Sequence, residues 1–340
     1  MSKVITFGEL LLRLSTPDFL KIDQATSFDA NYGGGEFNVA VSLANYGIET
    51  SFVTRLPKND LGLTAKSKIR QNGVDDDLVV FGGNQLGIYF LESGTSIRAS
   101  KVTYYRKDSA MATIQPGIID WEHVFKDATW FHWSGVTPAI SQSAADCCKE
   151  ALEVASQMNL KISTDLNYRS TLWNYGKHCN QVMPELLQYS NVILGDLDTA
   201  YFMMGLEIPN PDYSNDDEVK RLFDRILSSS ERLEMAAMTI RESVSASHQK
   251  IGGLLYVDNH LYRTKKQSVN HVVDRVGSGD AFMAGLIYGL QTYVNDYQKT
   301  LDFATFACCL KHTISGDTNR VSVDDVEALI LGDKSARVKR

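Results

Sequence analysis

The sequence predicts an α/β fold in which a largely parallel central sheet is flanked by helices, with a small second β-sheet beside it. Three observations support this prediction. Short apolar segments alternate with longer segments of helical periodicity along most of the chain, which is typical of successive strand–helix units. Two stretches break the alternation and contain only extended signals. Two glycine-rich corners open directly into helices of small residues, as loops do at the carboxyl edge of such a sheet.

The alternation defines the elements of the central sheet in chain order. Strands are predicted at residues 3–8, 50–54, 129–133, 160–165, 191–195 and 235–241. Helices are predicted at residues 36–46, 60–72, 141–157, 179–189, 216–228, 279–292, 300–313 and 323–331. The polar corners 33–38, 165–169 and 277–280 all follow extended segments, so we expect them to meet at one edge of the sheet.

The two stretches that break the alternation are residues 9–32 and 86–107. Apolar, β-branched and aromatic residues dominate their extended parts, such as Leu10–Leu14 and Val102–Arg106, and these residue types favour strands. We expect the two stretches to pair into the small sheet. The α/β domain then comprises residues 1–8, 33–85 and 108–332, and the basic tail 333–340 is expected to be frayed and solvated.

Composition indicates a globular protein and disfavours a nucleic-acid partner. The 340 residues are 44% hydrophobic, and 34 basic against 41 acidic residues give a net charge of −7. No run of 18 apolar residues occurs, and a strand begins at Val4, which leaves no room for a signal peptide. The five cysteines include no C-x-x-C pair, and the seven histidines show no metal-ligand spacing. We therefore predict a cytoplasmic protein without a protein-built metal site.

The corner Gly277-Ser278-Gly279-Asp280 predicts an anion-binding site with a base beside it. It opens the apolar helix from Ala281 to Leu290, and the N-terminus of a helix attracts anions through its free N–H groups. The glycines let an anion approach the backbone closely. Since a carboxylate would repel that anion, Asp280 suits the role of a base that takes a proton from an attacking hydroxyl.

The second corner, Gly33-Gly34-Gly35-Glu36-Phe37-Asn38, lies 240 residues earlier and opens the helix that Gly47 ends. Bare backbone beside the donor and acceptor of Asn38 suits a polyol. Either corner alone has a structural explanation, as a glycine cap before a helix or as a loop beside a buried asparagine. The two corners in this order favour a binding site.

The two corners together resemble the two signatures of the ribokinase-like (PfkB) carbohydrate kinases. The first is Asp274-x-x-Gly277-x-Gly279-Asp280, and the second is the Gly-Gly-x-x-x-Asn run that ends at Asn38. By contrast, the chain lacks the G-x-x-x-x-G-K-[ST] motif and a G-x-G-x-x-G motif after its first strand, so the common nucleotide motifs are absent. The resemblance implies a ribokinase-like fold, ATP and Mg²⁺, a small-sheet lid over the sugar, and a homo-oligomer formed through that lid.

Two arginines favour a sugar acid as the substrate. Tyr104 and Arg106 lie two residues apart on an extended segment and therefore face the same side. Arg169 follows a predicted strand in the run Asp165-Leu166-Asn167-Tyr168-Arg169. Guanidinium groups bind carboxylates through bidentate, charge-assisted hydrogen bonds, although each arginine has the alternative of a surface ion pair.

Similarity over nearly the full chain to the sugar-acid kinases of the family implies phosphorylation of the C6 hydroxyl of 2-keto-3-deoxygluconate. The implied sugar-binding residues are Gly34, Gly35, Asn38, Tyr89, Tyr104, Arg106, Asp165, Asn167 and Arg169. The implied catalytic residues are the base Asp280 and the anion hole Gly277, Ser278 and Gly279. The implied nucleotide-binding residues are Asp196, Thr239, Arg241, Ser243, Asp274, Gly277, Gly279, Lys311 and His312, of which Lys311 and His312 have the alternative of being solvated.

One segment departs from the family pattern. The usual Asn-x-x-Glu motif is tied to magnesium and phosphate, whereas this chain has Asp196-Leu197-Asp198-Thr199. Asp198, one residue away from the expected glutamate, is a candidate substitute. This departure keeps open the alternative of a catalytically weak sensor that binds a sugar acid. Because epimers differ at one hydroxyl, a kinase for 2-keto-3-deoxygalactonate, fructose or ribose is a separate alternative. The intact Asp280 corner favours the kinase.

Overall fold

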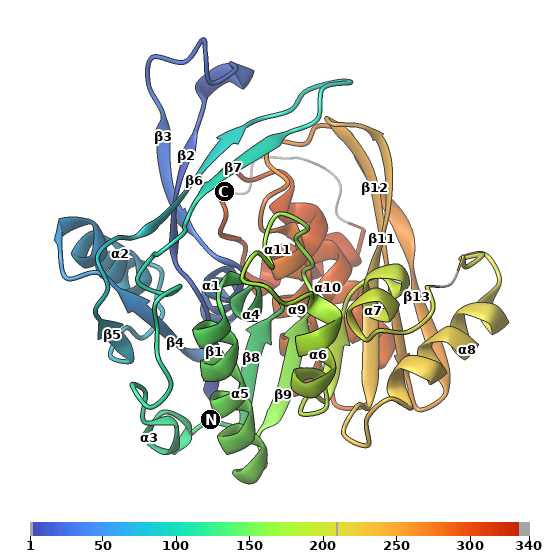
Figure 1. The fold of residues 1–340 in the computed structure, drawn as a ribbon. Helices are drawn as coiled ribbons and strands as arrows, with labels where there is room; N and C mark the ends of the chain where they lie inside the picture. The colour runs from blue at the N-terminus through green and yellow to red at the C-terminus, as the bar shows by residue number, and fades with distance from the viewer. Residues whose placement is uncertain (1–2, 209, 333–340) are drawn as a thin grey trace.

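The computed structural model describes residues 3–208 and 210–332, and within them a nine-stranded sheet runs through the centre of the protein (Figure 1). From one edge to the other its strands are β13 (His260–Val269), β12 (His248–Val257), β11 (Met235–Ser245), β10 (Val192–Leu194), β9 (Lys161–Asp165), β8 (Trp130–Ser134), β1 (Lys3–Phe7), β4 (Glu49–Leu56) and β5 (Val79–Phe81). Neighbours from β11 to β5 pair in parallel, whereas β12 pairs antiparallel with both β11 and β13. The predicted fold class is confirmed.

Helices cover both faces of this sheet because successive side chains of a strand point to opposite faces. Ile5 and Phe7 of β1 pack with α3 (Trp121–Phe125), α5 (Gln142–Gln157), α6 (Cys179–Leu187), α7 (Leu197–Met203) and α8 (Asp216–Leu227). Val4, on the other face, packs with α1 (Gly35–Asn45), α9 (Ser278–Thr292), α10 (Tyr297–Lys311) and α11 (Val323–Ile330). The helix α2 (Asp60–Gln71) packs against α1 and β4.

The small sheet projects from the body of the molecule (Figure 1). Its strands, in spatial order, are β3 (Asp29–Gly33), β2 (Leu11–Ser15), β6 (Gly87–Glu92) and β7 (Lys101–Tyr105). The turn between β6 and β7 reaches across to the turn between β11 and β12, where the Ala246 amide donates to the Ser96 carbonyl at 2.8 Å. The Ser96 amide donates to the Ser247 hydroxyl at 3.2 Å. The two sheets are therefore joined at the far end of the small one.

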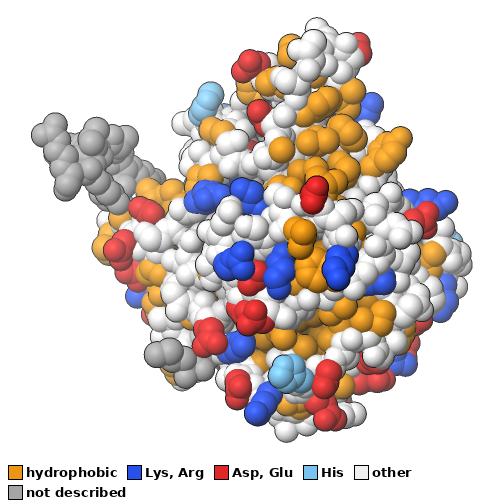
Figure 2. All heavy atoms as spheres, turned by 90° about the vertical axis from the view of Figure 1, so that its left-hand side faces the viewer, with side chains coloured by type: hydrophobic (Ala, Val, Ile, Leu, Met, Phe, Trp, Pro, Cys, Tyr) orange, Lys and Arg blue, Asp and Glu red, His pale blue; other side chains and the backbone are white. Residues whose placement is uncertain are grey.

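The small sheet has one inward and one outward face. Tyr89, Leu91 and Tyr104 face a cavity between the two sheets. On the outward face, Phe90 contacts Phe28 and Tyr105 edge to face. Figure 2 shows hydrophobic side chains gathered on the outer side of the projecting lobe, where Tyr105 is 71% exposed.

Each predicted strand and helix overlaps an observed one, but the sequence did not reveal β5, β12, β13, α3, α7 or the short α4 (Thr137–Ile140). All five cysteines are buried, and none forms a disulfide within residues 3–208 and 210–332. His132 is also buried, and its Nδ1 lies 3.0 Å from the Ser163 hydroxyl. Burial lowers the pKa of His132 to about 3, so it is a neutral core residue. The predicted tail 333–340 lies outside the described residues.

Among the helices of the described residues, none combines the length and the apolar character that a bilayer crossing requires.

Candidate active site

A cavity of about 890 Å³ lies between the carboxyl edge of the main sheet and the inward face of the small sheet. Its walls come from the ends of β9, β10 and β11, from the N-termini of α1 and α9, and from β6 and β7. This is the position at which α/β folds collect their ligands. The three corners that the sequence predicted to meet all contribute to the cavity.

Asn38 and Asp280 join the two glycine-rich corners. The first turns of α1 and α9 place them face to face, and the Asn38 Nδ2 atom donates to Asp280 Oδ2 at 2.7 Å. Asp280 is only 9% exposed. Burial raises the pKa of its carboxyl to about 6, although the hydrogen bond from Asn38 and the charge of Arg169 oppose that rise. Asp280 is thus a carboxylate near neutral pH with an unusually strong affinity for protons.

The glycines of the two corners differ in whether the protein has space for a side chain at their positions. Gly277 caps α9 with φ 81°, and a Cβ there would lie 1.9 Å from the Asp317 carbonyl oxygen. A Cβ on Gly34 would lie 2.1 Å from the Glu9 carbonyl oxygen. At Gly35 and Gly279 the nearest atoms would lie at 3.7 and 3.8 Å, so at these two positions space is available. Gly35 and Gly279 instead present bare backbone to the cavity.

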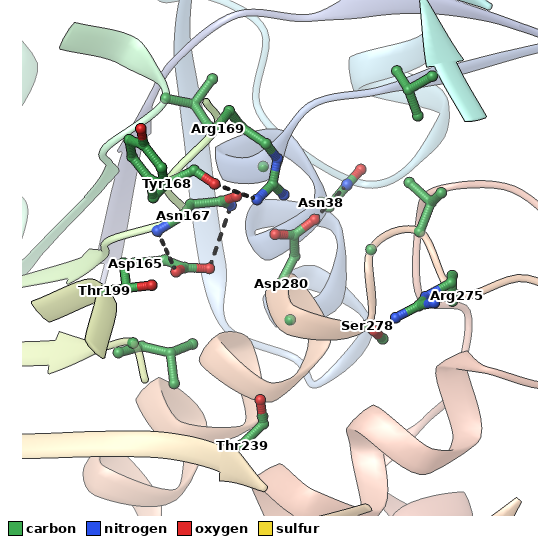
Figure 3. A pocket seen from close by; sticks show the side chains of 18 of the residues that line it. Asn38, Asp165, Asn167, Tyr168, Arg169, Thr199, Thr239, Arg275, Ser278 and Asp280 are labelled. Carbon is green, nitrogen blue, oxygen red and sulfur yellow. Dashed lines mark hydrogen bonds between the residues drawn. The ribbon is translucent and has the colours of Figure 1, made fainter. Parts of the chain in front are cut away.

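The segment after β9 supplies a second carboxylate and an exposed cation. The carboxylate of Asp165 accepts the Asn167 amide at 3.0 Å, and burial followed by the charge of Asp280 raises the pKa of Asp165 to about 7. Arg169 is exposed and donates to the Tyr168 carbonyl at 3.1 Å. Figure 3 shows its guanidinium directed toward Asn38 and Asp280. Since Arg169 makes no ion pair with a carboxylate among residues 3–208 and 210–332, its charge faces the cavity.

Arg106 also lines the cavity, but its charge is compensated by the protein itself. The guanidinium is 6% exposed and forms an ion pair with Glu9, with Arg106 Nε 2.8 Å from Glu9 Oε2. Its carbon lies 5.6 Å from the centre of the Tyr104 ring. For Arg106 the alternative of an ion pair therefore holds, although the pair is buried and not on the surface. A buried guanidinium is stable beside a carboxylate that compensates its charge. Its partner here, Glu9, lies 97 positions away along the chain, so residue spacing did not reveal the pair.

A buried ionic cluster that the sequence analysis did not predict lies under the cavity. Arg13 of β2 is 3% exposed, and its Nη2 and Nη1 atoms donate to Asp274 at 2.6 Å and Asp317 at 2.9 Å. The Tyr89 hydroxyl donates to Asp317 as well. Asp274 therefore holds the loop before the anion hole, through hydrogen bonds from the Val276 and Gly316 amides, and does not line the cavity. The one available signal was an arginine within the apolar run of β2.

Only part of the predicted nucleotide side faces the cavity. Thr239 and Arg241 of β11 line it, but the Ser243 hydroxyl donates to Gln249 outside it. Lys311 and His312 are both 0% exposed and do not line the cavity. The alternative that they are solvated is therefore wrong, since Lys311 donates to the Ile314 carbonyl and His312 contacts the Cys308 carbonyl inside the protein.

The departure at residues 196–199 lies at the cavity wall. Asp196 caps α7, since its carboxylate accepts the Thr199 amide at 2.9 Å and the Thr199 hydroxyl at 2.8 Å. Asp198 is exposed and lines the same wall. Burial and the charge of Asp196 raise the pKa of Asp198. Asp198 therefore offers oxygen atoms that no cap uses.

Other residues of the site had no assigned role from the sequence. Glu36 is fully buried beneath the first turn of α1 and accepts hydrogen bonds from the Ser134 and Thr137 hydroxyls at 2.7 and 2.8 Å. Tyr168, Tyr213, Arg275 and Asp317 line the cavity. Their contribution depends on how distant segments pack, which residue spacing does not encode.

Three comparisons with known proteins agree on one family. The model of the pfkB family carbohydrate kinases matches residues 1–322. The chain is 27% identical to a 2-dehydro-3-deoxygalactonokinase of Haloferax volcanii, over 97% of each chain. It is 38% identical to a crystal structure of 2-dehydro-3-deoxygluconokinase from Thermotoga maritima, with a TM-score of 0.92 over 98% of this chain and 100% of that one. A pfkB family carbohydrate kinase from Listeria grayi gives 30% identity and a TM-score of 0.89, over 97% and 100%.

Proposed function

The chain belongs to the pfkB family of carbohydrate kinases, and from this premise we propose that it transfers the terminal phosphoryl group of ATP to the C6 hydroxyl of 2-keto-3-deoxygluconate. The observation that carries the proposal is the buried Asp280 at the N-terminus of α9, bonded to Asn38 of the other corner. A base, an anion-binding backbone and a polyol-binding backbone thus share one cavity.

The reaction follows from the groups around Asp280. The C6 oxygen forms a bond to the γ-phosphorus, the bond between that phosphorus and the bridging oxygen of ADP breaks, and the hydroxyl proton passes to the Asp280 carboxylate. The hydrogen bond from Asn38 orients the carboxylate. The Ser278 N–H donates to the Arg275 carbonyl at 3.3 Å, so we assign the stabilisation of negative charge on the transferred group mainly to the N–H groups of Gly277 and Gly279.

A sugar acid fits the charge of the cavity better than a neutral sugar does. Arg169 faces the cavity on the side of Asn38 and Asp280 and has no carboxylate partner among the described residues, so we assign the substrate carboxylate to it. Tyr89, Tyr104 and the Arg106–Glu9 pair then form the roof from the small sheet. In this role the small sheet is a lid, which keeps water away from the phosphoryl group.

The galacto epimer of the substrate is the second candidate. The Haloferax volcanii relative, which matches over 97% of this chain, is named for 2-dehydro-3-deoxygalactonate. The two sugar acids differ at one hydroxyl group, and pockets often discriminate weakly between such epimers.

Magnesium is expected to accompany ATP, and the residues present fit it. The carboxylates of Asp196 and Asp198 at the cavity wall supply the oxygen ligands that Mg²⁺ prefers, and the ion usually keeps several waters and phosphate oxygens. When bound, Mg²⁺ supplies positive charge to the phosphates. The Asp196 carboxylate already caps α7, whereas no helix cap uses that of Asp198. We therefore assign Asp198 the position closer to the magnesium ion.

The outward face of the lid fits a second copy of the chain. Phe28, Phe90 and Tyr105 form a contiguous aromatic surface there, and exposed apolar patches of this kind mark interfaces. We propose a homodimer through this face. Sedimentation velocity should give twice the monomer mass of 37.9 kDa, and a monomer at micromolar concentration would reject the interface. The use of ATP and the five buried cysteines, none of which forms a disulfide among the described residues, fit a cytoplasmic enzyme.

The deciding experiment is an ADP-release assay with Mg-ATP and four acceptors. The acceptors are 2-keto-3-deoxygluconate, its galacto epimer, fructose and ribose. We expect high turnover with the two sugar acids and little with the neutral sugars. Equal turnover with fructose would reject the role of Arg169, and absence of turnover with all four would reject the proposed substrate class.

A further inference from the structure

Two arginines meet beside the anion hole without any carboxylate between them. Arg241 of β11 and Arg275, two residues before Gly277, both line the cavity. Arg241 Nη2 lies 3.2 Å from the Ser278 hydroxyl, in the first turn of α9. Figure 3 shows the Arg275 side chain directed toward Ser278 as well. Both guanidiniums therefore converge on the N-terminus of the helix that carries Asp280.

Neither guanidinium is neutralised by the protein. Within residues 3–208 and 210–332, neither forms an ion pair with an aspartate or a glutamate. The Nε atom of Arg241 is buried and has no hydrogen-bond partner there. This contrasts with Arg13 and Arg106, which lie in the same part of the molecule and are both paired with carboxylates.

The arrangement costs the empty protein free energy. Burial and the positive charge of Arg241 both lower the pKa of Arg275, which indicates that two like charges are held near each other. Their charges also reach His312, whose pKa lies at about 4, mainly because it is buried. Like charges in a partly buried place repel each other more strongly than in water. A bound anion removes that cost, so the pair is a site for an anion with several oxygen atoms.

The anion hole adds to the same attraction. The helix α9 begins at Ser278, the residue that Arg241 contacts, and the N-terminal end of a helix carries partial positive charge that attracts anions. Asp280 lies in the same first turn, two residues after Ser278, so an anion held here has some of its oxygen atoms close to the base. Among the phosphates of a nucleotide, the one beside the base is the terminal one.

We propose that Arg241 and Arg275 form a two-arginine clamp that binds the terminal phosphate of the nucleotide and stays bound to it during transfer. This inference rests on the proposed kinase function for the identity of the anion. Planar guanidinium groups bind phosphate oxygens in pairs. In the clamp both guanidinium groups contact the transferred group and are catalytic residues, and the hydrogen bond to Ser278 holds Arg241 in place.

The clamp also offers a reason why the chain tolerates Thr199. An acidic network that holds magnesium and phosphate is reduced here to Asp196 and Asp198. Two guanidiniums supply positive charge to the phosphate directly. The glutamate that the family pattern has in place of Thr199 is then less necessary for holding the phosphate.

The test measures binding of inorganic tripolyphosphate, without metal or sugar, by isothermal titration calorimetry. Arg275→Met and Arg241→Met should each weaken binding by about 10- to 100-fold, the usual value of charge-assisted hydrogen bonds. The control is Arg221→Met, since Arg221 is an exposed residue of α8 outside the cavity. Arg275→Lys should recover only part of the affinity, because an ammonium group lacks the planar pair of donors. Binding of adenosine should be unchanged in all variants.

The outcomes separate the clamp from the proposed function. Wild-type affinity for tripolyphosphate in Arg275→Met and Arg275→Lys would overturn the clamp, even if the protein phosphorylates a sugar acid. An equal loss in Arg221→Met would also overturn it, because net charge alone would then explain the binding. A selective loss in the two clamp variants together with an absence of sugar turnover would support the clamp and reject the proposed function.

Discussion

Replacement of Asp280 by asparagine tests the mechanism most directly. The amide has nearly the same shape as the carboxylate and still offers an oxygen to Asn38, so the corner should keep its geometry. It cannot accept a proton from the substrate. We expect kcat to fall by roughly 10²- to 10⁴-fold, the usual contribution of a positioned base, while binding of ATP and of the sugar acid stays close to that of the wild type.

The pKa of Asp280 determines the pH dependence of the wild type. Because burial raises this pKa to about 6, the carboxylate is mostly ionised at pH 7. At pH 5 only about one tenth of it remains ionised, so kcat/KM should be about tenfold below its plateau. Asp165 holds its proton to higher pH, with a pKa of about 7. The fall of kcat/KM as the pH drops through about 6 therefore reports protonation of Asp280.

The same substitution has a predicted effect on stability. The folded-state pKa of Asp280 lies above its ordinary value of 3.8, so ionisation costs the fold free energy at every pH above about 6. That cost fades as the pH falls toward 3.8. Because the difference corresponds to about 3 kcal/mol at most, Asp280→Asn should unfold with a higher free energy than the wild type at pH 8 and lose this advantage below pH 4.

Steady-state rates between pH 5 and pH 9 and urea unfolding at pH 8 and pH 4 measure both effects. Asp302→Asn is the matched control, since Asp302 bonds to Thr264 away from the cavity. A turnover within threefold of wild type, or a limb near pH 6 that persists in Asp280→Asn, would refute the role of Asp280 as the base. Asp165→Asn should keep the limb near pH 6.

Three further substitutions test other parts of the site. Arg169→Gln should raise KM for the sugar acid by about 10- to 100-fold and leave turnover of neutral sugars unchanged, because it removes a charge-assisted bond to the carboxylate. Arg13→Met should lower the free energy of unfolding by about 3–5 kcal/mol, since Asp274 and Asp317 lose their buried partner. Gly277→Ala should abolish most activity, because the new Cβ would collide with the Asp317 carbonyl and strain a φ of 81°.

Each of these has its own control. Arg225→Gln, on the exposed side of α8, should leave KM unchanged, and an equal rise in KM there or for fructose would contradict the role of Arg169. An unchanged urea midpoint for Arg13→Met would show that the cluster adds nothing to stability. Gly117 also has a positive φ, but a Cβ added there would meet open space. Gly117→Ala therefore measures the effect of backbone strain without a collision. Activity near that of wild type in Gly277→Ala would show that the anion hole tolerates the displacement.

The fold was predictable where the chain follows simple periodicity. The parallel strands β1, β4, β8, β9, β10 and β11 contain short apolar runs and were predicted, whereas the three-residue parallel strand β5 was too short to be recognised. The antiparallel β12 and β13 were not, because β12 contains Gly252 and Gly253 and β13 carries Lys265 and Lys266. A basic edge strand and a strand with paired glycines weaken the apolar pattern by which strands are recognised.

The site was predictable where a motif fixes the local backbone. Both glycine corners and the segment 165–169 do reach one cavity. The ionic partners were not predictable, since Arg13 lies 261 positions from Asp274 and Arg106 lies 97 positions from Glu9. Residue types reveal that a charge is present, but only tertiary packing decides whether a carboxylate or a ligand neutralises it.

The hydrogen bond between Asn38 and Asp280 links positions 242 residues apart. The two residues of the proposed catalytic pair are therefore synthesised early and late in translation, and Asn38 cannot orient Asp280 until α9 docks on α1. Contacts of such long sequence separation form late in folding. In a refolding experiment, recovered activity should consequently lag behind recovered helicity, and a fragment that ends before α9 should have none, however well its strands assemble.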